Sequence, residues 1–285
     1  MTVELGIFAR IFTRPTAGEV AAAVAGAGFG LVQLNLSSIG EPTVPPVGAA
    51  VDFAGRRSAF EAHGVRIWGL SCTYNLVHPD LALRDEYTAR AEWLIGRAPE
   101  LGAEVVTLCS GTRDAEDMWR AHPSNSSPEA WAELRTSLDK LLPAAEGAGV
   151  RLGIEPEPGN IVADAARARD LLAELGNDAR LIGIVVDPAN LVTPATAPDQ
   201  DRILRHAFGV LGAETVALHA KDVVSTGAYA AAGLGQLDYD LVFELHAALP
   251  ASVPVIVQDS NEADVPRTRR FLLSSALRQE ARASG

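Results

Sequence analysis

Short apolar runs alternate with longer amphipathic, alanine-rich segments along the whole chain. Near-continuous apolar runs are typical of strands buried on both faces of a parallel sheet, and the segments between them are typical of helices that cover such a sheet. The runs predict eight strands, at residues 3–9, 31–36, 65–71, 104–109, 151–155, 182–187, 214–219 and 254–258. The other segments predict eight helices, near residues 16–27, 49–63, 83–101, 128–148, 162–176, 199–211, 238–249 and 264–281.

Eight strands that alternate with eight helices favour a closed (β/α)8 barrel, the TIM barrel of the α/β class. A length of 285 residues fits one such barrel, so we expect a single domain over residues 1–285. The rival fold is a doubly wound open sheet, but the first strand–helix turn, FARIFTRPTAGE, lacks the GxGxxG sequence typical of its phosphate-binding turn. Ser127 with Pro128, and Asp238, indicate two helix starts, because these residue types favour helix N-termini.

Composition and charge narrow the class of protein. Hydrophobic residues make up 48% of the chain and no apolar run is long enough to span a bilayer, so we do not expect a membrane protein. The N-terminal stretch MTVELGIFAR lacks the features of a signal peptide, and we therefore expect a cytoplasmic protein. A formal net charge of -12 argues against nucleic-acid binding, which needs a basic surface. Cys72 and Cys109 belong to no CxxC pair, and we expect both to be small buried apolar residues.

Polar side chains stand at the ends of four consecutive predicted strands. Glu155 ends the fifth strand, Asp187 the sixth, His219 the seventh and Gln258 the eighth. Because the C-terminal ends of barrel strands meet at one mouth, these side chains would converge on a common point. Oxygen and nitrogen donors without a thiolate suit one divalent cation, namely Mn, Mg, Co or Zn. The sequence therefore predicts a metal site.

Each of these residues also has a structural interpretation. Asp187 precedes a proline and could cap a helix, His219 could satisfy a buried hydrogen bond, and Gln258 could bind a loop. Burying several polar donors at the same depth without a shared partner costs free energy, so the combination favours the metal site.

Longer motifs surround the strand ends. They are IEPEPGN, DPANL, HAKD and GLGQLDY in the second half of the chain, and TYNLVHPD and LCSGTRD in the first half. Together they resemble the sugar phosphate isomerase/epimerase family with the xylose isomerase-like TIM barrel, over nearly the whole chain. The resemblance implies a barrel enzyme that acts on a carbohydrate.

The resemblance also implies roles for single residues. The family's metal-ligand positions match Glu155, Asp187 and His219, while Asn190 and Lys221 lie in the accompanying DPAN and HxKD motifs.

One position departs from the family. Its sugar epimerases have a glutamate at the strand-eight ligand position, where that residue is implicated in proton transfer together with the strand-five glutamate. This chain has Gln258 there, followed by Asp259. Glutamine can coordinate a metal through its carbonyl oxygen but cannot shuttle a proton. A two-glutamate mechanism is therefore in doubt, and another group must serve as the base.

The candidate proton carriers are Glu157, His78 and Lys221, with Asp259 less favoured. Side chains alternate along a strand, so Glu155 and Glu157 would face the same way, and one could bind the metal while the other acts as a base. A structural salt bridge from Glu157 to Arg113 or Lys221 is the alternative. The expected catalytic set is therefore Glu155, Glu157, His78 and Lys221.

Other polar and aromatic side chains would surround the mouth. The candidates for substrate contacts are Arg10, Gln33, Asn35, Arg113 and Asn190. Arginine can clamp a carboxylate, a phosphate or a sugar hydroxyl. Trp68 lies inside a predicted strand and is expected in the core, whereas Trp119 fits either the core or a sugar-stacking role. We expect the irregular stretches 37–48, 110–127 and 224–237 to form a rim or lid.

The motifs and the resemblance together imply a divalent-metal-dependent isomerase or epimerase of a small sugar, keto-sugar or polyol derivative, acting by proton transfer through a metal-stabilised enediolate. Gln258 keeps two alternatives open: a metal-dependent lyase or dehydratase on a keto-inositol or keto-glycoside, and a non-catalytic sugar-binding barrel. An apurinic-site endonuclease uses a related barrel but needs more well-placed histidines than this chain offers. Symmetric association is common among such barrels, so we expect a homo-oligomer.

Overall fold

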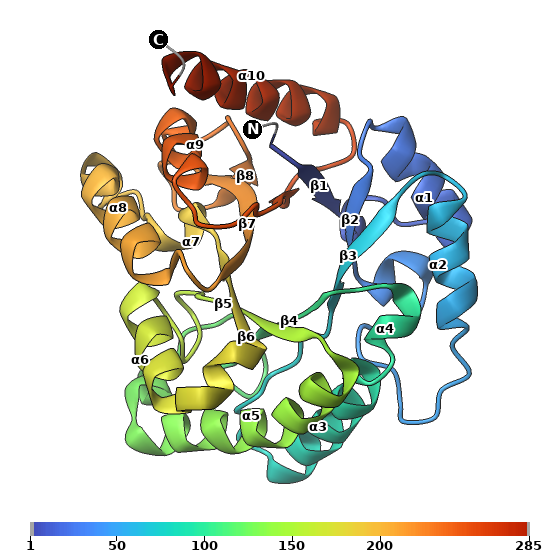
Figure 1. The fold of residues 1–285 in the computed structure, drawn as a ribbon. Coiled ribbons are helices and arrows are strands. Elements are labelled where there is room, and N and C mark those ends of the chain that lie inside the picture. Colours follow the sequence, from blue (N-terminus) through green and yellow to red (C-terminus); the bar gives the residue numbers. More distant parts are fainter. Residues whose placement is uncertain (1–2, 284–285) are drawn as a thin grey trace.

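A closed ring of parallel strands forms the centre of the protein (Figure 1). The computed structural model describes residues 3–283. The ring consists of β1 (Leu5–Phe8), β2 (Leu31–Leu34), β3 (Arg66–Ser71), β4 (Val105–Cys109), β5 (Arg151–Glu155), β6 (Ile182–Val186), β7 (Thr215–Val223) and β9 (Val255–Val257). Neighbouring strands pair in parallel, and the pairs β6–β7, β7–β9 and β9–β1 close the ring. The predicted single-domain TIM barrel is therefore confirmed.

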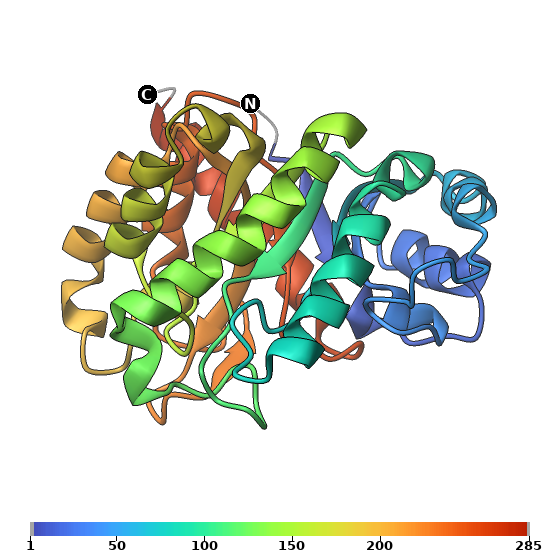
Figure 2. The same ribbon diagram turned by 90° about the horizontal axis from the view of Figure 1, so that it is seen from below.

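Helices surround the ring on its outside (Figures 1 and 2). They are α1 (Ala17–Gly26), α2 (Phe53–Glu61), α3 (Leu81–Ile95), α4 (Ala98–Leu101), α5 (Pro128–Ala148), α6 (Ala165–Leu175), α7 (Pro188–Leu191), α8 (Gln200–Leu211), α9 (Tyr239–Ala247) and α10 (Val265–Ala283). Short 3-10 helices are η1 (Ala9–Ile11), η2 (Leu36–Ile39), η3 (Pro123–Ser126), η4 (Gly176–Leu181) and η5 (Ala197–Asp199). Within residues 3–283, no helix combines the length and apolar character needed to cross a membrane.

Both helix starts indicated by the sequence are confirmed. The Ser127 hydroxyl accepts a hydrogen bond from the Ala130 backbone N–H and begins α5. The Asp238 carboxylate accepts from two backbone N–H groups and begins α9. Such caps satisfy N–H groups that have no partner inside the helix and stabilise it by about 1 kcal/mol each.

Two elements differ from the expectation. The predicted helix at 83–101 is divided into two helices, α3 and α4, which are separated by Gly96 and Arg97. Pro99 lies near the start of α4, and a proline is tolerated at a helix start but not in a helix interior. The predicted strand at 214–219 continues to Val223, because its last residues pair antiparallel with β8 (Tyr229–Ala231). The turn of this hairpin and β8 lie in the stretch 224–237, for which the sequence predicts irregular structure.

The barrel interior is built in two layers. The lower layer is an apolar plug of Leu31, Trp68, Val105, Val185, Ala217 and Ile256. Side chains two positions further along a strand point the same way, one layer higher. Five of the six plug residues are followed at this spacing by a polar residue, namely Gln33, Thr107, Asp187, His219 and Gln258, whereas Trp68 is followed by the apolar Leu70. The expectation that Trp68 belongs to the core is confirmed, since the residue is buried in this plug.

The outer faces of the strands pack against the helices. In α5, the buried residues include Leu134, Leu138, Leu141 and Ala145, which recur at the three- and four-residue spacing of one helix face. Burial of each leucine stabilises the fold by roughly 1.5–3 kcal/mol. Figure 2 shows α5 beside α3 on the outside of the barrel. Cys72 and Cys109 are buried free thiols, as predicted.

Close packing of the barrel wall gives a stability prediction. A Cβ atom on Gly183 of β6 would lie 2.5 Å from Val216 Cγ1 and 3.1 Å from Val216 Cβ. We therefore expect Gly183→Ala to lower the free energy of unfolding by about 1–3 kcal/mol, measured by urea denaturation. Gly209 in α8 has no atom within 4 Å of such a Cβ, so Gly209→Ala should raise stability by about 0.5–1 kcal/mol. A neutral Gly183→Ala variant would contradict this account of the wall.

Candidate active site

Three side chains meet at the C-terminal end of the barrel strands. Glu155 is the last residue of β5, Asp187 follows β6, and His219 lies in β7. One donor atom from each of these three residues lies within 4.8 Å of the other two, and we call the three residues the cluster. The register produces this convergence, because β5 pairs with β6 and β6 pairs with β7.

Several buried polar atoms at this end of the barrel have no hydrogen-bond partner. They include Asp187 Oδ2, His219 Nδ1 and Gln258 Oε1. His219 Nδ1 lies 3.0 Å from Glu155 Oε2, and Asp187 Oδ2 lies 3.3 Å from Lys221 Nζ. Neither contact has the angular geometry of a hydrogen bond. Buried polar atoms are nearly always satisfied in folded proteins, and a cation held by two carboxylates, an imidazole and an amide oxygen would satisfy these. The residues present therefore fit a divalent metal ion.

The two carboxylate oxygens of Asp187 fit the two roles predicted for it, helix cap and metal ligand. Its Oδ1 accepts a hydrogen bond of 2.8 Å from the Ala189 backbone N–H, which caps the short helix α7. Its Oδ2 is the atom without a hydrogen bond. The cap fixes the orientation of the carboxylate, so that Oδ2 is directed toward Glu155 and His219.

Charges in the cluster shift one another's ionisation. Burial raises the pKa of Asp187 to about 6, even though Lys221 opposes that shift. Burial alone would also raise the pKa of Glu155, but His219, Lys221 and the Asn190 amide reverse the effect and lower it. Burial would lower the pKa of His219, but the carboxylate of Glu155 raises it. The cluster is therefore a set of mutually dependent charges.

Asn190 links the two glutamates of the IEPEPGN motif. Its Nδ2 donates hydrogen bonds to Glu155 Oε1 at 2.9 Å and to Glu157 Oε2 at 2.8 Å. A further hydrogen bond of 3.2 Å goes to the Pro156 carbonyl oxygen. Burial, reinforced by the charge of Glu155, raises the pKa of Glu157 to about 7. Glu157 forms no ion pair with Arg113 or Lys221 at salt-bridge distance among residues 3–283, so the alternative of a structural salt bridge receives no support.

Lys221 is buried beside the cluster with only 3% of its side chain exposed. Its Nζ lies 3.3 Å from Asp187 Oδ2 and 3.6 Å from Asp259 Oδ2. The ammonium also lies 3.8 Å from the centre of the Tyr229 ring, on its face. Burial would lower the pKa of Lys221, but the neighbouring carboxylates, Asp187 first, raise it above its ordinary value. The resting site therefore holds Lys221 in its protonated form.

The next residue along β7 holds the hairpin loop. The buried Asp222 carboxylate accepts hydrogen bonds from the backbone N–H groups of Val223, Gly233 and Leu237. The HAKD motif thus supplies a cluster residue, a buried cation and a loop anchor within four positions.

A cavity of about 480 Å³ opens above the cluster. Its lining includes Arg10, Trp119, Glu157, Lys221, Tyr229, Gln258 and Asp259. Asp259 has a φ of 45°, and it is the one non-glycine residue with positive φ in the described part of the chain. Non-glycine residues in this region are strained, and such strain is concentrated at functional sites. A cavity of equal volume lies at the opposite end of the barrel, between α9 and α10, and none of Glu157, Lys221 and Gln258 lines it.

His78, expected as a proton carrier, is not brought to this cavity. Its Nε2 lies 3.1 Å from the Ala115 carbonyl oxygen, and its Nδ1 accepts a hydrogen bond of 3.1 Å from the Asp80 backbone N–H. The ring lines a separate cavity beside α3. Both ring nitrogens are therefore engaged in holding the loop that follows β3.

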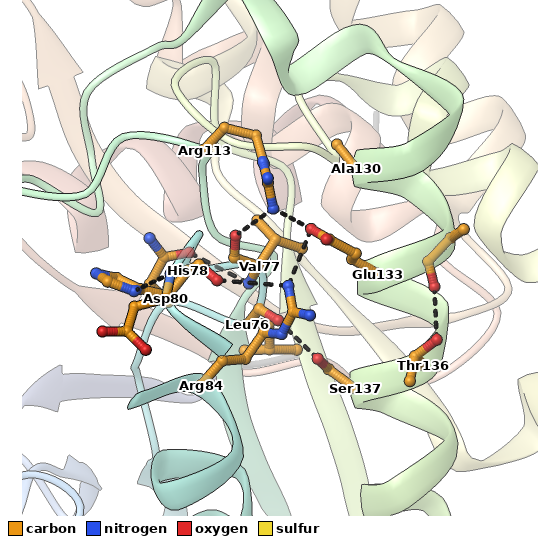
Figure 3. Close-up of polar contacts among 12 residues, drawn as sticks. Leu76, Val77, His78, Asp80, Arg84, Arg113, Ala130, Glu133, Thr136 and Ser137 are labelled. Atoms are coloured by element: carbon orange, nitrogen blue, oxygen red, sulfur yellow. Dashed lines mark hydrogen bonds and ion pairs between the residues drawn. The ribbon is translucent and has the colours of Figure 1, made fainter. Parts of the chain in front are cut away.

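Arg113, expected at the mouth, is engaged in an ion network behind the loops (Figure 3). Its Nη1 forms an ion pair with Glu133 of α5 and donates to the Val77 carbonyl oxygen at 3.3 Å. Glu133 also pairs with Arg84 of α3 at 2.9 Å. The network ties the loops after β3 and β4 to α3 and α5, and Arg113 does not line the cavity above the cluster.

Some of the remaining candidates for substrate contacts line the cavity, and others are engaged in contacts within the protein. Arg10 lines the cavity, as does Trp119, which is 48% exposed. Asn35 is buried and caps η2 by accepting from the Ser37 backbone N–H at 3.0 Å. Gln33 is buried beneath the cavity and contacts His219.

Tyr229 lines the cavity, but the sequence does not predict this role, because a strand of three residues leaves no periodic pattern.

The sequence matches the family model described as xylose isomerase-like TIM barrel over residues 21–274. No curated protein sequence matches it significantly. Among solved structures, a D-tagatose 3-epimerase-like protein has a TM-score of 0.75 at 15% identity, over 98% of this chain and 99% of that chain. The 3-keto-D-glucoside 4-epimerase from E. coli has a TM-score of 0.70 at 16% identity, over 98% and 99%.

A xylose isomerase-like TIM barrel protein from Mycobacterium smegmatis, in complex with magnesium, has a TM-score of 0.65 at 18% identity, over 96% of this chain and 97% of that chain. At these identities the solved structures agree with the fold, and the family model covers most of the sequence. The chain therefore belongs to the xylose isomerase-like TIM barrel family.

Proposed function

We propose that this protein is a divalent-metal-dependent isomerase or epimerase of a small sugar, keto-sugar or polyol derivative. The observation that carries the proposal is the convergence of Glu155, Asp187 and His219 donor atoms within 4.8 Å, beside a cavity that Glu157 and Lys221 line. The buried atoms without hydrogen bonds in the same region support it. The similar solved structures include a D-tagatose 3-epimerase-like protein, a 3-keto-D-glucoside 4-epimerase and an L-ribulose 3-epimerase, which supports the substrate class.

Glu155, Asp187, His219 and Gln258 would hold the cation, which we expect to be Mn, Mg, Co or Zn. A bound divalent cation supplies Lewis-acid chemistry, which stabilises negative charge on a substrate oxygen. The magnesium complex of the similar Mycobacterium smegmatis barrel supports a hard cation.

Glu157 would remove the proton from the carbon beside the substrate carbonyl. Its carboxylate lines the cavity, and the Asn190 amide holds one oxygen in place at 2.8 Å. Tyr229 contacts the other oxygen, with its hydroxyl 3.4 Å from Glu157 Oε1. A positioned carboxylate of this kind suits general base catalysis.

Lys221 would act from another part of the cavity wall. An isomerisation can return the proton to the neighbouring carbon from the same carboxylate, but an epimerisation needs a donor on the opposite face of the substrate. The Lys221 ammonium comes from β7, whereas Glu157 follows β5, so the two groups approach the cavity from different strands. Lys221 would supply the second proton or stabilise the charge that develops.

Arg10 and Asn190 remain the proposed substrate contacts. Arg10 has no hydrogen-bond or ion-pair partner among residues 3–283, so its guanidinium is free to bind a hydroxyl or an anionic group of the substrate. Asn190 Oδ1 is a buried acceptor without a partner. Asn35 and Arg113 are engaged elsewhere, and we do not assign them to the substrate.

Gln258 favours one second candidate function. Because glutamine cannot exchange a proton, the site offers fewer carboxylates than a symmetrical epimerase would need. A metal-dependent lyase or dehydratase on a keto-inositol or keto-glycoside removes one proton and expels a leaving group, and a single base suffices for that reaction. Analysis of the products from each substrate class distinguishes the two functions, since the lyase changes the substrate's formula and the isomerase does not.

Metal removal tests the proposed centre. Dialysis against EDTA should abolish solvent-deuterium incorporation into D-tagatose or L-ribulose, and addition of Mn²⁺ should restore it, measured by mass spectrometry. Asp187→Ala should lose the metal, measured by elemental analysis. Asp164→Ala is the matched control, because Asp164 also caps a helix but lies outside the cluster, so that variant should keep its metal. Full exchange activity in the metal-free protein would rule out this function.

Substitution of Glu157 tests the proposed base. Glu157→Gln keeps an oxygen that can accept from Asn190 but removes the basic carboxylate, so deuterium exchange should fall by about 10²–10⁴-fold. Metal content should not change. Glu116→Gln, an exposed change in the loop after β4, is the control and should exchange like the unaltered protein. Unchanged exchange in Glu157→Gln would transfer the role of base to another residue.

A further inference from the structure

Gln33 lies directly behind His219, on the side away from the cluster. Gln33 Oε1 lies 2.9 Å from His219 Nε2, and both side chains are buried, with exposed fractions of 2% and 3% for the residues. Gln33 is not part of the lining of the cavity above the cluster, which does not support the expected sugar contact. Its environment consists of protein groups.

Two hydroxyl groups contact the nitrogen end of the Gln33 amide. Its Nε2 donates to Ser71 Oγ and to Thr107 Oγ1, each at 3.2 Å. These two hydrogen bonds use both N–H groups of the amide. The carbonyl oxygen is the atom that faces His219.

This orientation determines which nitrogen of His219 carries a proton. A carbonyl oxygen only accepts hydrogen bonds, so His219 Nε2 must donate. In the neutral ring Nδ1 is then unprotonated, and Nδ1 is the nitrogen that lies 3.0 Å from Glu155 Oε2. The lone pair of His219 is thereby directed toward Glu155 and Asp187.

We propose that Gln33 is a positioning residue that selects the Nε2-protonated tautomer of His219 and orients its Nδ1 as a metal ligand. The consequence for metal binding rests on the proposed function, whereas the tautomer depends only on the contact between the two side chains. Histidine ligands of metals generally donate their second ring N–H to a protein acceptor, and loss of that acceptor weakens metal binding.

The strand pattern explains why Gln33 occupies this place. Leu31 belongs to the apolar plug, and Gln33 stands two positions further along β2, in the polar layer. Thr107 stands in the same relation to Val105 in β4. The amide, the two hydroxyls and the imidazole thus form one buried row above the plug.

Gln33→Leu removes the acceptor with little change in side-chain size. The two hydroxyls can still pair with each other, since Thr107 Oγ1 lies 3.4 Å from Ser71 Oγ. We expect this variant to fold and to bind Mn²⁺ about 10–100-fold more weakly in equilibrium dialysis. Gln33→Glu retains an acceptor oxygen and should bind within about tenfold of the unaltered protein.

Ser137→Ala is the control for loss of a buried hydrogen bond. The Ser137 hydroxyl donates to the Leu76 carbonyl oxygen at 2.6 Å, on the helical side of the barrel wall (Figure 3). Its removal should lower the melting temperature without changing Mn²⁺ affinity. Equal Mn²⁺ affinities for Gln33→Leu and the unaltered protein would overturn the proposed role in metal binding.

Nitrogen-15 NMR of histidine-labelled protein reads the tautomer without reference to activity. Spectra would be recorded for Zn²⁺-loaded protein, and for metal-free protein at a pH high enough to leave the ring neutral, with His219→Gln used to assign the signal. We expect a proton on Nε2 and none on Nδ1, and loss of this preference in metal-free Gln33→Leu. A proton on Nδ1 in the unaltered protein would overturn the proposal. If the unaltered protein binds no metal, the proposed function fails, and the metal-free spectra still decide the tautomer.

Discussion

The two-residue alternation of side chains along a closed ring of parallel strands is the constraint on which the site depends. Val185 and Asp187, and likewise Ala217 and His219, are such pairs, with an apolar residue in the plug and a polar residue above it. Because the ring is closed, polar side chains from different strands must share one small volume. The plug beneath them excludes water, which strengthens every electrostatic interaction in that volume.

The buried charges restrain one another. Lys221 balances the carboxylates of Asp187 and Glu157, and Asn190 holds Glu157 beside Glu155 through one amide nitrogen. A buried charge without a partner is costly, so none of these groups can be removed without changing the ionisation of the rest. The arrangement therefore gives the site its geometry through electrostatics as much as through packing.

The sequence predicts the fold and the converging strand ends well, because both follow from periodicity in short, regular segments. It predicts loop residues poorly: His78 and Arg113 follow β3 and β4, and the structure places both in contacts that hold loops rather than at the cavity. Such contacts depend on long-range packing, which leaves no local pattern. Gln33 was recognised as a polar residue at a strand end, but its partner, His219, is 186 positions away in the sequence.

The spacing of polar residues in the terminal part of β7 leaves little freedom for a change of length within the strand. His219 and Lys221 lie two positions apart on one face of the strand, toward the cluster and the cavity, and Asp222 holds the loop from the other face. Insertion or deletion of a single residue between Thr215 and His219 would exchange the inward and outward faces and misplace all three side chains at once. We expect a change of length after Val223, by contrast, to alter the hairpin and reshape the pocket while the cluster stays intact.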